Sequence, residues 1–155
     1  MSEAYNLLTT RDEIFQTMVR YGHGLDLKDA SLLGSVFADS FEFDFSNLHG
    51  RPAGKTTPTQ FVKSAFHFMR EMKTLHQITN PRIEVYGDRA TGMFDIVGWH
   101  YAPRQDGDSE YIVRGFYDEQ FQQIGAEWKI VRHTIRVAYS TGNPNLFDWN
   151  SSPNQ

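Results

Sequence analysis

The sequence predicts an α+β fold in which helices fill the first part of the chain and one sheet fills the rest. Apolar residues recur at helical spacing before residue 40, and from Leu75 onward long alternating segments are joined by short turns. The 155 residues have the size of one domain. We therefore expect a single domain over 1–155, with its core at about 10–140, a C-terminal tail at 141–155, and three helices on a curved sheet of five or six strands.

The first helix is predicted over residues 10–25, where Thr10 and Glu13 have the spacing of a capping box. Its inward face is marked by apolar side chains at helical spacing, namely Ile14, Met18, Tyr21 and Leu25. A second row widens this face and consists of Phe15, Val19, Gly22 and Asp26.

Two further helices are expected before the sheet. Asp29 stands where an N-cap would begin a short helix, whose inward side chains are Leu32, Leu33, Val36 and Phe37. A third helix is predicted over residues 57–72, with Thr57 as its N-cap and Pro58 at its first position. Its apolar stripe consists of Phe61, Ala65, Phe68, Met69 and Met72.

The strands are predicted from alternation of apolar and polar residues. A half-buried strand covers Asp39–Phe45, and its inner side chains are Phe41, Phe43 and Phe45. The segment Ser46–Thr56, which contains Gly and Pro, is interpreted as a surface loop. Tight turns then separate four more strands, Pro81–Tyr86, Arg89–Pro103, Tyr111–Gln123 and Glu127–Ser140. Long strands joined in this way form an antiparallel meander.

Composition excludes several classes of function. The chain has no Cys, which excludes disulfides, thiolate nucleophiles and thiolate metal sites. Its 15 Lys and Arg against 19 Asp and Glu give a net charge of −4, which argues against a nucleic-acid partner. Because it lacks both a membrane-length apolar run and a secretory leader, we expect a cytoplasmic protein with no membrane partner. Aromatic residues make up 14%, which favours a ring-lined pocket or a large core.

The six histidines sort into two groups. Those expected to face solvent are His23, His49 and His67. Those in or beside strands, and therefore expected to be buried, are His76, His100 and His133. A buried histidine is more often a hydrogen-bonded core residue than a catalyst, and both alternatives stay open at this point.

Asp26 also has two readings. It lies at the end of the first helix, on the flank of the apolar face. It either caps the turn into the second helix or pairs with a buried imidazole that faces a cavity. In the second case the carboxylate would select one tautomer of the histidine and prepare it to act as a general base.

Several short segments resemble the SnoaL-like families of the nuclear transport factor 2 superfamily. These are Tyr21–Asp29, then Leu32, Leu33, Val36–Asp39 and Phe41–Asp44, and later Asn80–Ile83 after His76, Ala90–Gly92 and Trp128–Ile130. The resemblance covers about residues 10–140. It implies a cone-shaped, mixed but mostly antiparallel sheet with three helices packed on its concave side.

Within that superfamily the chain is most similar to scytalone dehydratase and the bile acid 7α-dehydratases. Catalytic positions of the first family correspond here to Asp26, His76 and His100, and Tyr21 falls on the catalytic tyrosine of the second. The chain also departs from both patterns. The two carbonyl-holding tyrosines of scytalone dehydratase are replaced by Leu25 and Phe45. Its serine and asparagine correspond to Gly115 and Tyr117, and the aspartate of the bile acid enzymes corresponds to Gly98. Scytalone is therefore not the expected substrate.

The resemblance implies a cofactor-free lyase or isomerase, with no metal, that acts on a hydrophobic oxygenated ring such as a polyketide or terpenoid. His76 and His100 would form the acid–base pair, Asp26 would orient one of them, and Tyr21 would donate a hydrogen bond. The expected substrate-binding residues are Tyr117, Phe45, Leu25, Phe43, Trp99 and His133.

Two alternatives remain open at this stage. A cyclase or ring-rearranging isomerase could use the same pocket, and a non-catalytic ligand-binding module, such as a small subunit of a ring-hydroxylating dioxygenase, could retain the same residues. We also expect a homo-oligomer, either a dimer or a trimer. In the polar tail, Phe147 and Trp149 are expected to fold over the mouth of the cone or onto a neighbouring subunit.

Overall fold

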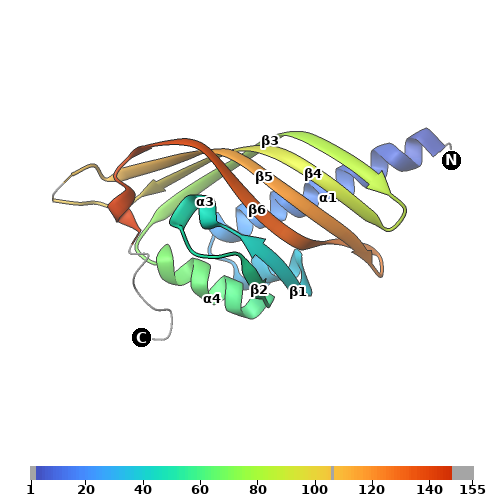
Figure 1. Cartoon of the computed structure of the whole chain (residues 1–155), viewed down its shortest axis with the longest axis horizontal. Helices are drawn as coiled ribbons and strands as arrows, with labels where there is room; N and C mark the ends of the chain where they lie inside the picture. Colours follow the sequence, from blue (N-terminus) through green and yellow to red (C-terminus); the bar gives the residue numbers. More distant parts are fainter. Residues whose placement is uncertain (1–2, 106, 148–155) are drawn as a thin grey trace.

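The computed structural model describes residues 3–105 and 107–147, and it consists of a curved six-stranded sheet with helices on its concave side (Figure 1). The strand order is β2-β1-β6-β5-β4-β3. β1 runs parallel to β6, and the other neighbouring pairs in the described chain are antiparallel. The predicted α+β fold with a mixed, mostly antiparallel sheet is therefore confirmed.

The helices of the described chain are α1 (Glu3–Asp26), α2 (Ala30–Ser35), α3 (Ser46–His49) and α4 (Pro58–Phe68), followed by a short 3₁₀ helix, η1 (Pro144–Leu146). α1 begins well before the predicted start at residue 10. Thr10 lies inside this helix and is not its N-cap, because the residues before it are mostly good helix formers that continue the helix. The early turns carry exposed Leu7 and Leu8, so they extend past the core.

The caps predicted for the second and third helices are confirmed. Oδ1 of Asp29 accepts a hydrogen bond from the backbone N–H of Leu32 at 2.9 Å. Thr57 and Gln60 form a reciprocal capping box at the start of α4. The end of α4 differs from its prediction, because the helix stops at Phe68 and Met69 is its C-cap.

The strands are β1 (Phe37–Asp44), β2 (Gly54–Thr56), β3 (Lys73–Tyr86), β4 (Arg89–Tyr101), β5 (Glu110–Ile124) and β6 (Glu127–Gly142). β3 begins earlier than predicted and passes through a bulge between Thr79 and Arg82, where Asn80 has a φ of 51°. A bulge tolerates Pro81, which has no N–H to donate to the ladder. Ser46–Thr56 is not a plain loop, because it contains α3 and the edge strand β2.

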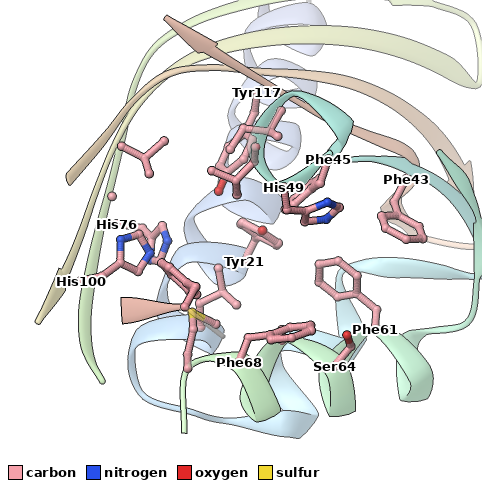
Figure 2. Close-up of a pocket in the computed structure, with 18 of the residues that line it drawn as sticks. Tyr21, Phe43, Phe45, His49, Phe61, Ser64, Phe68, His76, His100 and Tyr117 are labelled. Carbon is pink, nitrogen blue, oxygen red and sulfur yellow. The ribbon is translucent and has the colours of Figure 1, made fainter. Parts of the chain in front are cut away.

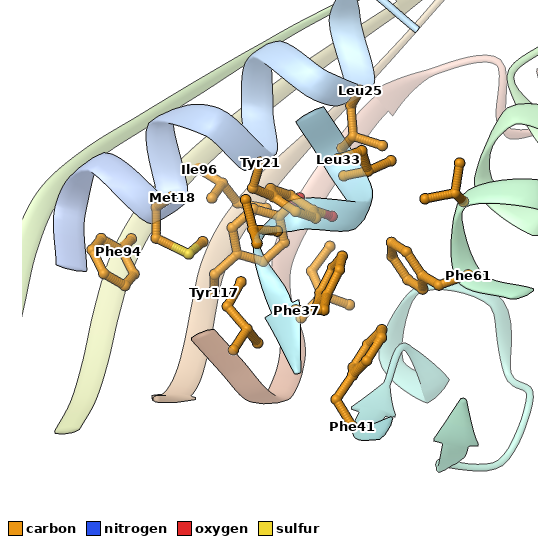
Figure 3. Close-up of a cluster of buried hydrophobic side chains, with 14 of the residues drawn as sticks. Met18, Tyr21, Leu25, Leu33, Phe37, Phe41, Phe61, Phe94, Ile96 and Tyr117 are labelled. Atoms are coloured by element: carbon orange, nitrogen blue, oxygen red, sulfur yellow. The ribbon is translucent and has the colours of Figure 1, made fainter. Parts of the chain in front are cut away.

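The core lies between α1 and the sheet (Figure 3). From α1, the predicted inward residues Ile14, Met18, Tyr21 and Leu25 are at most 3% exposed. They face buried side chains of the sheet, including Phe94, Ile96 and Tyr117. At one end Phe37 and Phe41 of β1 stack with ring centroids 4.0 Å apart, and Phe61 of α4 packs edge-on against both rings.

The tail returns to the body of the domain. Leu146 and Phe147 are 2% and 6% exposed, and the ring of Phe147 lies 4.8 Å from that of His100. Phe147 therefore folds back to the mouth of the cone, as predicted. Leu146 is buried beside it, although no prediction included this residue. Trp149 lies outside the described residues. Within the described part of the chain, no helix is both long and apolar enough to cross a membrane.

Candidate active site

A cavity of about 350 Å³ lies between the concave side of the sheet and α4 (Figure 2). This volume lies within the usual range of small-molecule sites. Its wall is mainly apolar and includes Leu25, Phe43, Phe45, Phe61, Phe68 and Phe147. The buried polar side chains that face it are Tyr21, His76, His100 and Tyr117, and its more exposed polar rim includes His49, Arg51 and Ser64.

Asp26 and His76 form a hydrogen-bonded pair at this cavity. Oδ1 of Asp26 lies 2.7 Å from Nδ1 of His76, and Oδ2 accepts the backbone N–H of His76, also at 2.7 Å. The hydroxyl of Thr74 donates a third hydrogen bond to Oδ1 at 2.9 Å. Burial alone would raise the pKa of Asp26, but the hydrogen bonds and the charge of His76, together with Thr74, lower it below its ordinary value.

This pairing settles the tautomer of His76. A carboxylate only accepts hydrogen bonds, so the ring proton of a neutral His76 resides on Nδ1. Nε2 then carries the free lone pair, and the ring is part of the cavity wall. The reading of Asp26 as partner of a buried imidazole, rather than as a cap of the following turn, agrees with this geometry.

His100 lies beside His76 with ring centroids 5.4 Å apart and the rings nearly perpendicular. Nδ1 of His100 lies 3.1 Å from the carbonyl oxygen of Tyr111, so this nitrogen carries the proton that it donates. Burial, and next the neighbouring His76, lower the pKa of His100 to about 3. His100 is therefore neutral near pH 7, and its Nε2 is a hydrogen-bond acceptor.

Gly98 makes room for both imidazoles. Gly98 precedes His100 by two residues on β4, so Gly98 and His100 face the same side of the sheet. Gly98 is also the cross-strand partner of His76 on β3. A Cβ added to Gly98 would lie 3.2 Å from Cε1 of His100 and 3.3 Å from Nε2 of His76. A larger residue at this position would displace one or both rings.

Behind the cavity wall lies a second histidine–carboxylate pair. Nδ1 of His133 lies 2.6 Å from Oε1 of Glu119, and both side chains are 0% exposed. Nε2 of His133 lies 2.9 Å from the hydroxyl of Tyr21, which faces the cavity. Burial raises the pKa of Glu119, although its contact with His133 opposes this shift.

Tyr21 and Tyr117 form the adjoining part of the wall. Their rings meet edge-on with centroids 5.4 Å apart. Burial raises the pKa of both phenols above the ordinary value of 10.0. Both side chains are therefore neutral near pH 7 and offer O–H groups rather than phenolates.

The structure places most of the predicted site residues together. The predicted residues that line this cavity are His76, His100, Tyr21, Tyr117, Phe45, Leu25 and Phe43. Asp26 lies behind His76 and contacts its ring. His133 does not line it, which corrects its assignment to the substrate contacts, because its ring lies behind Tyr21. Trp99 is also outside the cavity, since it lies between inward-facing Gly98 and His100 and points to the outer face of the sheet.

The sequence-based predictions misplaced His49 and did not include Glu119. His49 was expected in solvent, but α3 places it at the rim of the cavity. Glu119 was not considered, although it shares the inward parity of Tyr117 and Phe121 on β5, which is the signal that marks a buried carboxylate there. No group of three or more His, Asp or Glu side chains in 3–105 and 107–147 is arranged to hold a metal ion.

Comparison with known proteins agrees with this architecture. Residues 6–134 match the model of the SnoaL-like domain. The Kfla4162 protein from Kribbella flavida is 26% identical, with a TM-score of 0.86 over 90% of this chain and 97% of that chain. A type 2 hexachlorocyclohexane dehydrochlorinase, LinA, is 20% identical, with a TM-score of 0.76 over 91% and 93% of the two chains.

A protein from Novosphingobium aromaticivorans, described as a candidate scytalone dehydratase, has a similar backbone. It is 20% identical, with a TM-score of 0.74 over 92% of each chain. At this level of identity the last two likenesses show the fold alone. No curated protein sequence matches the chain at a significant level.

Proposed function

Because this chain belongs to the SnoaL-like domain family, we propose that it is a cofactor-free lyase or isomerase that removes a proton next to a carbonyl group. One observation carries this proposal: Oδ1 of Asp26 lies 2.7 Å from Nδ1 of His76, and the ring of His76 forms part of the wall of a mainly apolar cavity of about 350 Å³. A carboxylate-oriented imidazole in a mainly apolar pocket has the arrangement that general-base catalysis requires.

His76 is the base in this proposal. Its Nε2 takes the proton from the carbon next to the carbonyl, and Asp26 stabilises the positive charge that the ring then carries. The electron pair of the broken C–H bond moves to the carbonyl oxygen and forms an enolate. The phenolic hydroxyls of Tyr21 and Tyr117, which face the same cavity, can donate hydrogen bonds to that oxygen.

The leaving-group step also uses His76. With a pKa of about 3, His100 holds no proton to give near pH 7, so it does not serve as the stored acid. Instead its Nε2 accepts a hydrogen bond from the substrate hydroxyl and orients it. The enolate reforms the carbonyl, the carbon–oxygen bond at the β position breaks, and His76 returns its proton to the departing oxygen as water. In an isomerase the same proton returns to a different carbon.

The wall of the cavity supports a hydrophobic ring as the substrate. Phe43, Phe45 and Phe61 form one side of it, across from the two histidines (Figure 2). Their faces and edges suit flat, apolar ring systems, and the few polar groups at the histidine side fix the oxygen substituents. A polyketide-like or terpenoid-like ketone with a β-hydroxyl group has this combination of features.

A homo-oligomer remains part of the proposal. The outer face of the sheet carries Leu75 and Tyr101, which are 61% and 42% exposed, and Trp99 on β4 is the cross-strand partner of Leu75. Exposed apolar side chains that gather on one face favour contact with another protein. A second copy of this chain is the partner we expect, and sedimentation of the wild-type protein beside a Leu75→Glu variant tests it.

The test of the chemistry needs no knowledge of the natural substrate. The bicyclic ketone 1-tetralone is incubated with the protein in D₂O, and deuterium entering the carbon next to the carbonyl is followed by NMR. We expect exchange with wild type and little with His76→Gln or Asp26→Asn. The matched controls are His23→Gln and Asp39→Asn, which change exposed residues outside the cavity.

Equal exchange by wild type and His76→Gln, with 1-tetralone and with the related ketones 1-indanone and 4-chromanone, would contradict the proposed proton abstraction. Binding of these ketones without any exchange would instead favour the non-catalytic ligand-binding alternative.

A further inference from the structure

Glu119 and His133 take no part in the proposed proton transfer, yet both are completely buried directly behind it. They are cross-strand partners on β5 and β6, and their side chains meet at 2.6 Å. From His133 the contacts continue to the hydroxyl of Tyr21 at 2.9 Å. A buried acid and a buried base are thus joined by hydrogen bonds to the phenol of Tyr21, which lines the cavity beside Tyr117.

The number of protons in this cluster decides which way its hydrogen bonds run. If Glu119 and the His133 ring share one proton, it lies between Oε1 and Nδ1, and Nε2 must accept the O–H of Tyr21. Tyr21 then has no hydrogen left for the cavity. The whole cluster would carry one negative charge.

If Glu119 and His133 share two protons, the direction reverses. The second proton sits on Nε2 and is donated to the oxygen of Tyr21. The O–H of Tyr21 is then not used by His133 and remains for the cavity, whose wall Tyr21 helps to form. The cluster is electrically neutral, whether the first proton is nearer Oε1 or Nδ1.

Burial favours the neutral arrangement. An uncompensated charge at a site with 0% exposure is costly, whereas a neutral cluster or an ion pair is not penalised in the same way. The other charged groups that act on the cluster are Asp26, from α1, and Asp118, from β5. Both are acidic, so they add to the cost of a further negative charge.

We infer that Glu119 and His133 are positioning residues that hold a proton on Nε2 of His133 and so turn the phenolic O–H of Tyr21 toward the ligand in the cavity. The substrate implied is one with a carbonyl oxygen at the phenols while its acidic carbon faces His76. This assignment of the carbonyl rests on the proposed function, but the proton on Nε2 does not.

The proton is tested first, in the wild-type protein without ligand. Nitrogen-15 NMR distinguishes a protonated from an unprotonated ring nitrogen, and the His133 signals are assigned by triple-resonance spectra at pH 7. We expect Nε2 of His133 to be protonated. An unprotonated Nε2 would overturn the inference, whatever the protein catalyses.

The direction of the phenol is tested with 1-tetralone as the probe, carrying carbon-13 at its carbonyl. Its infrared carbonyl stretch falls in frequency when the oxygen accepts a hydrogen bond. We expect a lowered frequency in wild type and in Glu110→Gln, an exposed control on the same strand. The probe in a Tyr21→Phe, Tyr117→Phe double variant should lose this shift, and a shift that persists there would overturn the inference.

Glu119→Gln links the two readouts. The amide can face the ring with either its oxygen or its nitrogen, so the nitrogen-15 spectrum reports which nitrogen of His133 holds the remaining proton. The carbonyl shift should survive if Nε2 keeps the proton and disappear if Nε2 loses it. A mismatch in either direction would contradict the inference, even if deuterium exchange were unaffected. If this variant does not fold, the wild-type spectrum still decides.

Discussion

Oδ1 of Asp26 lies 2.7 Å from Nδ1 of His76, although 50 positions of the chain separate the two residues. The contact exists because the C-terminal end of α1 lies against β3, and the same carboxylate also accepts the backbone N–H of His76. The backbone of the strand therefore fixes the carboxylate, and the carboxylate in turn fixes the ring. Such an imidazole is oriented before any substrate arrives.

The first prediction concerns this pair. His76→Ala should slow deuterium exchange into 1-tetralone by about 10²–10⁴-fold, which is the usual contribution of a general acid–base group. Asp26→Asn should slow it as well, because a neutral amide does not stabilise the imidazolium and can hold the wrong tautomer. Exchange rates measured by NMR at pH 7 check both, and an Asp26→Asn protein with unchanged rate would show that the carboxylate only supports the fold.

The second prediction concerns pH and His100. The pKa of His100 is about 3 in the folded protein, against an ordinary value of 6.5. As the pH falls, the unfolded chain therefore binds a proton at this histidine before the folded protein does. The contribution of His100 to the free energy of unfolding is complete above pH 6.5. It is lost as the pH falls toward 3, by about 1.4 kcal/mol per pH unit at most. The free energy of unfolding of His100→Gln should fall less steeply over this range.

Urea unfolding at several pH values measures this slope. Glu119 acts in the opposite sense above pH 4.5, since burial raises its pKa, but it is common to both proteins and cancels in the difference. His23→Gln, which changes an exposed histidine, is the control. Parallel curves for wild type and His100→Gln would mean that His100 is not kept neutral by burial.

The third prediction concerns the space beside Gly98. A Cβ there would come within 3.2–3.3 Å of both imidazoles, so Gly98→Ala should displace the rings by a few tenths of an ångström. Catalysis depends on such positions more than folding does, and we expect a loss in exchange rate of up to about 10²-fold. Gly34→Ala, whose Cβ would meet only ordinary contacts of 3.9–4.0 Å, should leave the rate unchanged. Equal rates for the two variants would contradict a role for this gap.

The sequence predicted those elements in which apolar residues recur with the period of a helix or a strand. The inward row of α1 and the alternation of β4 and β5 determine which side chains are buried, and they were readable from spacing alone. The caps at Asp29 and Thr57 were also readable, because each uses a side chain close in sequence. Ser46–Thr56 was misread, since β2 forms only by pairing with β1.

Partners across the fold were harder to predict. Convergence of Asp26 with His76 came from a family resemblance, because no local pattern joins a helix end to a strand in this way. The Glu119–His133 contact depends on the register of β5 and β6, which contains two irregularities and is not specified by the turn alone. His133 was therefore placed against substrate, when the structure places it behind Tyr21.

The last prediction concerns the tail. Phe147 covers His100 at 4.8 Å between ring centroids, packs against Tyr111 at 6.1 Å, and forms part of the cavity wall. Truncation after Thr141 removes Phe147 together with buried Leu146 and exposes the histidine side of the cavity to water. Burying one large apolar side chain contributes about 1.5–3 kcal/mol, so loss of this cover should weaken binding of 1-tetralone by roughly ten-fold or more.

The same truncation should leave the sheet folded, because the paired part of β6 before residue 141 and the core of α1 remain. Dissociation constants from tryptophan fluorescence and thermal unfolding midpoints separate the two effects. Phe147→Ala in the full chain is the sharper variant, since it keeps the backbone of η1 and removes only the ring over His100. If both variants bind 1-tetralone as tightly as wild type, the tail does not close the cavity, and His100 is kept neutral by the walls of the sheet alone.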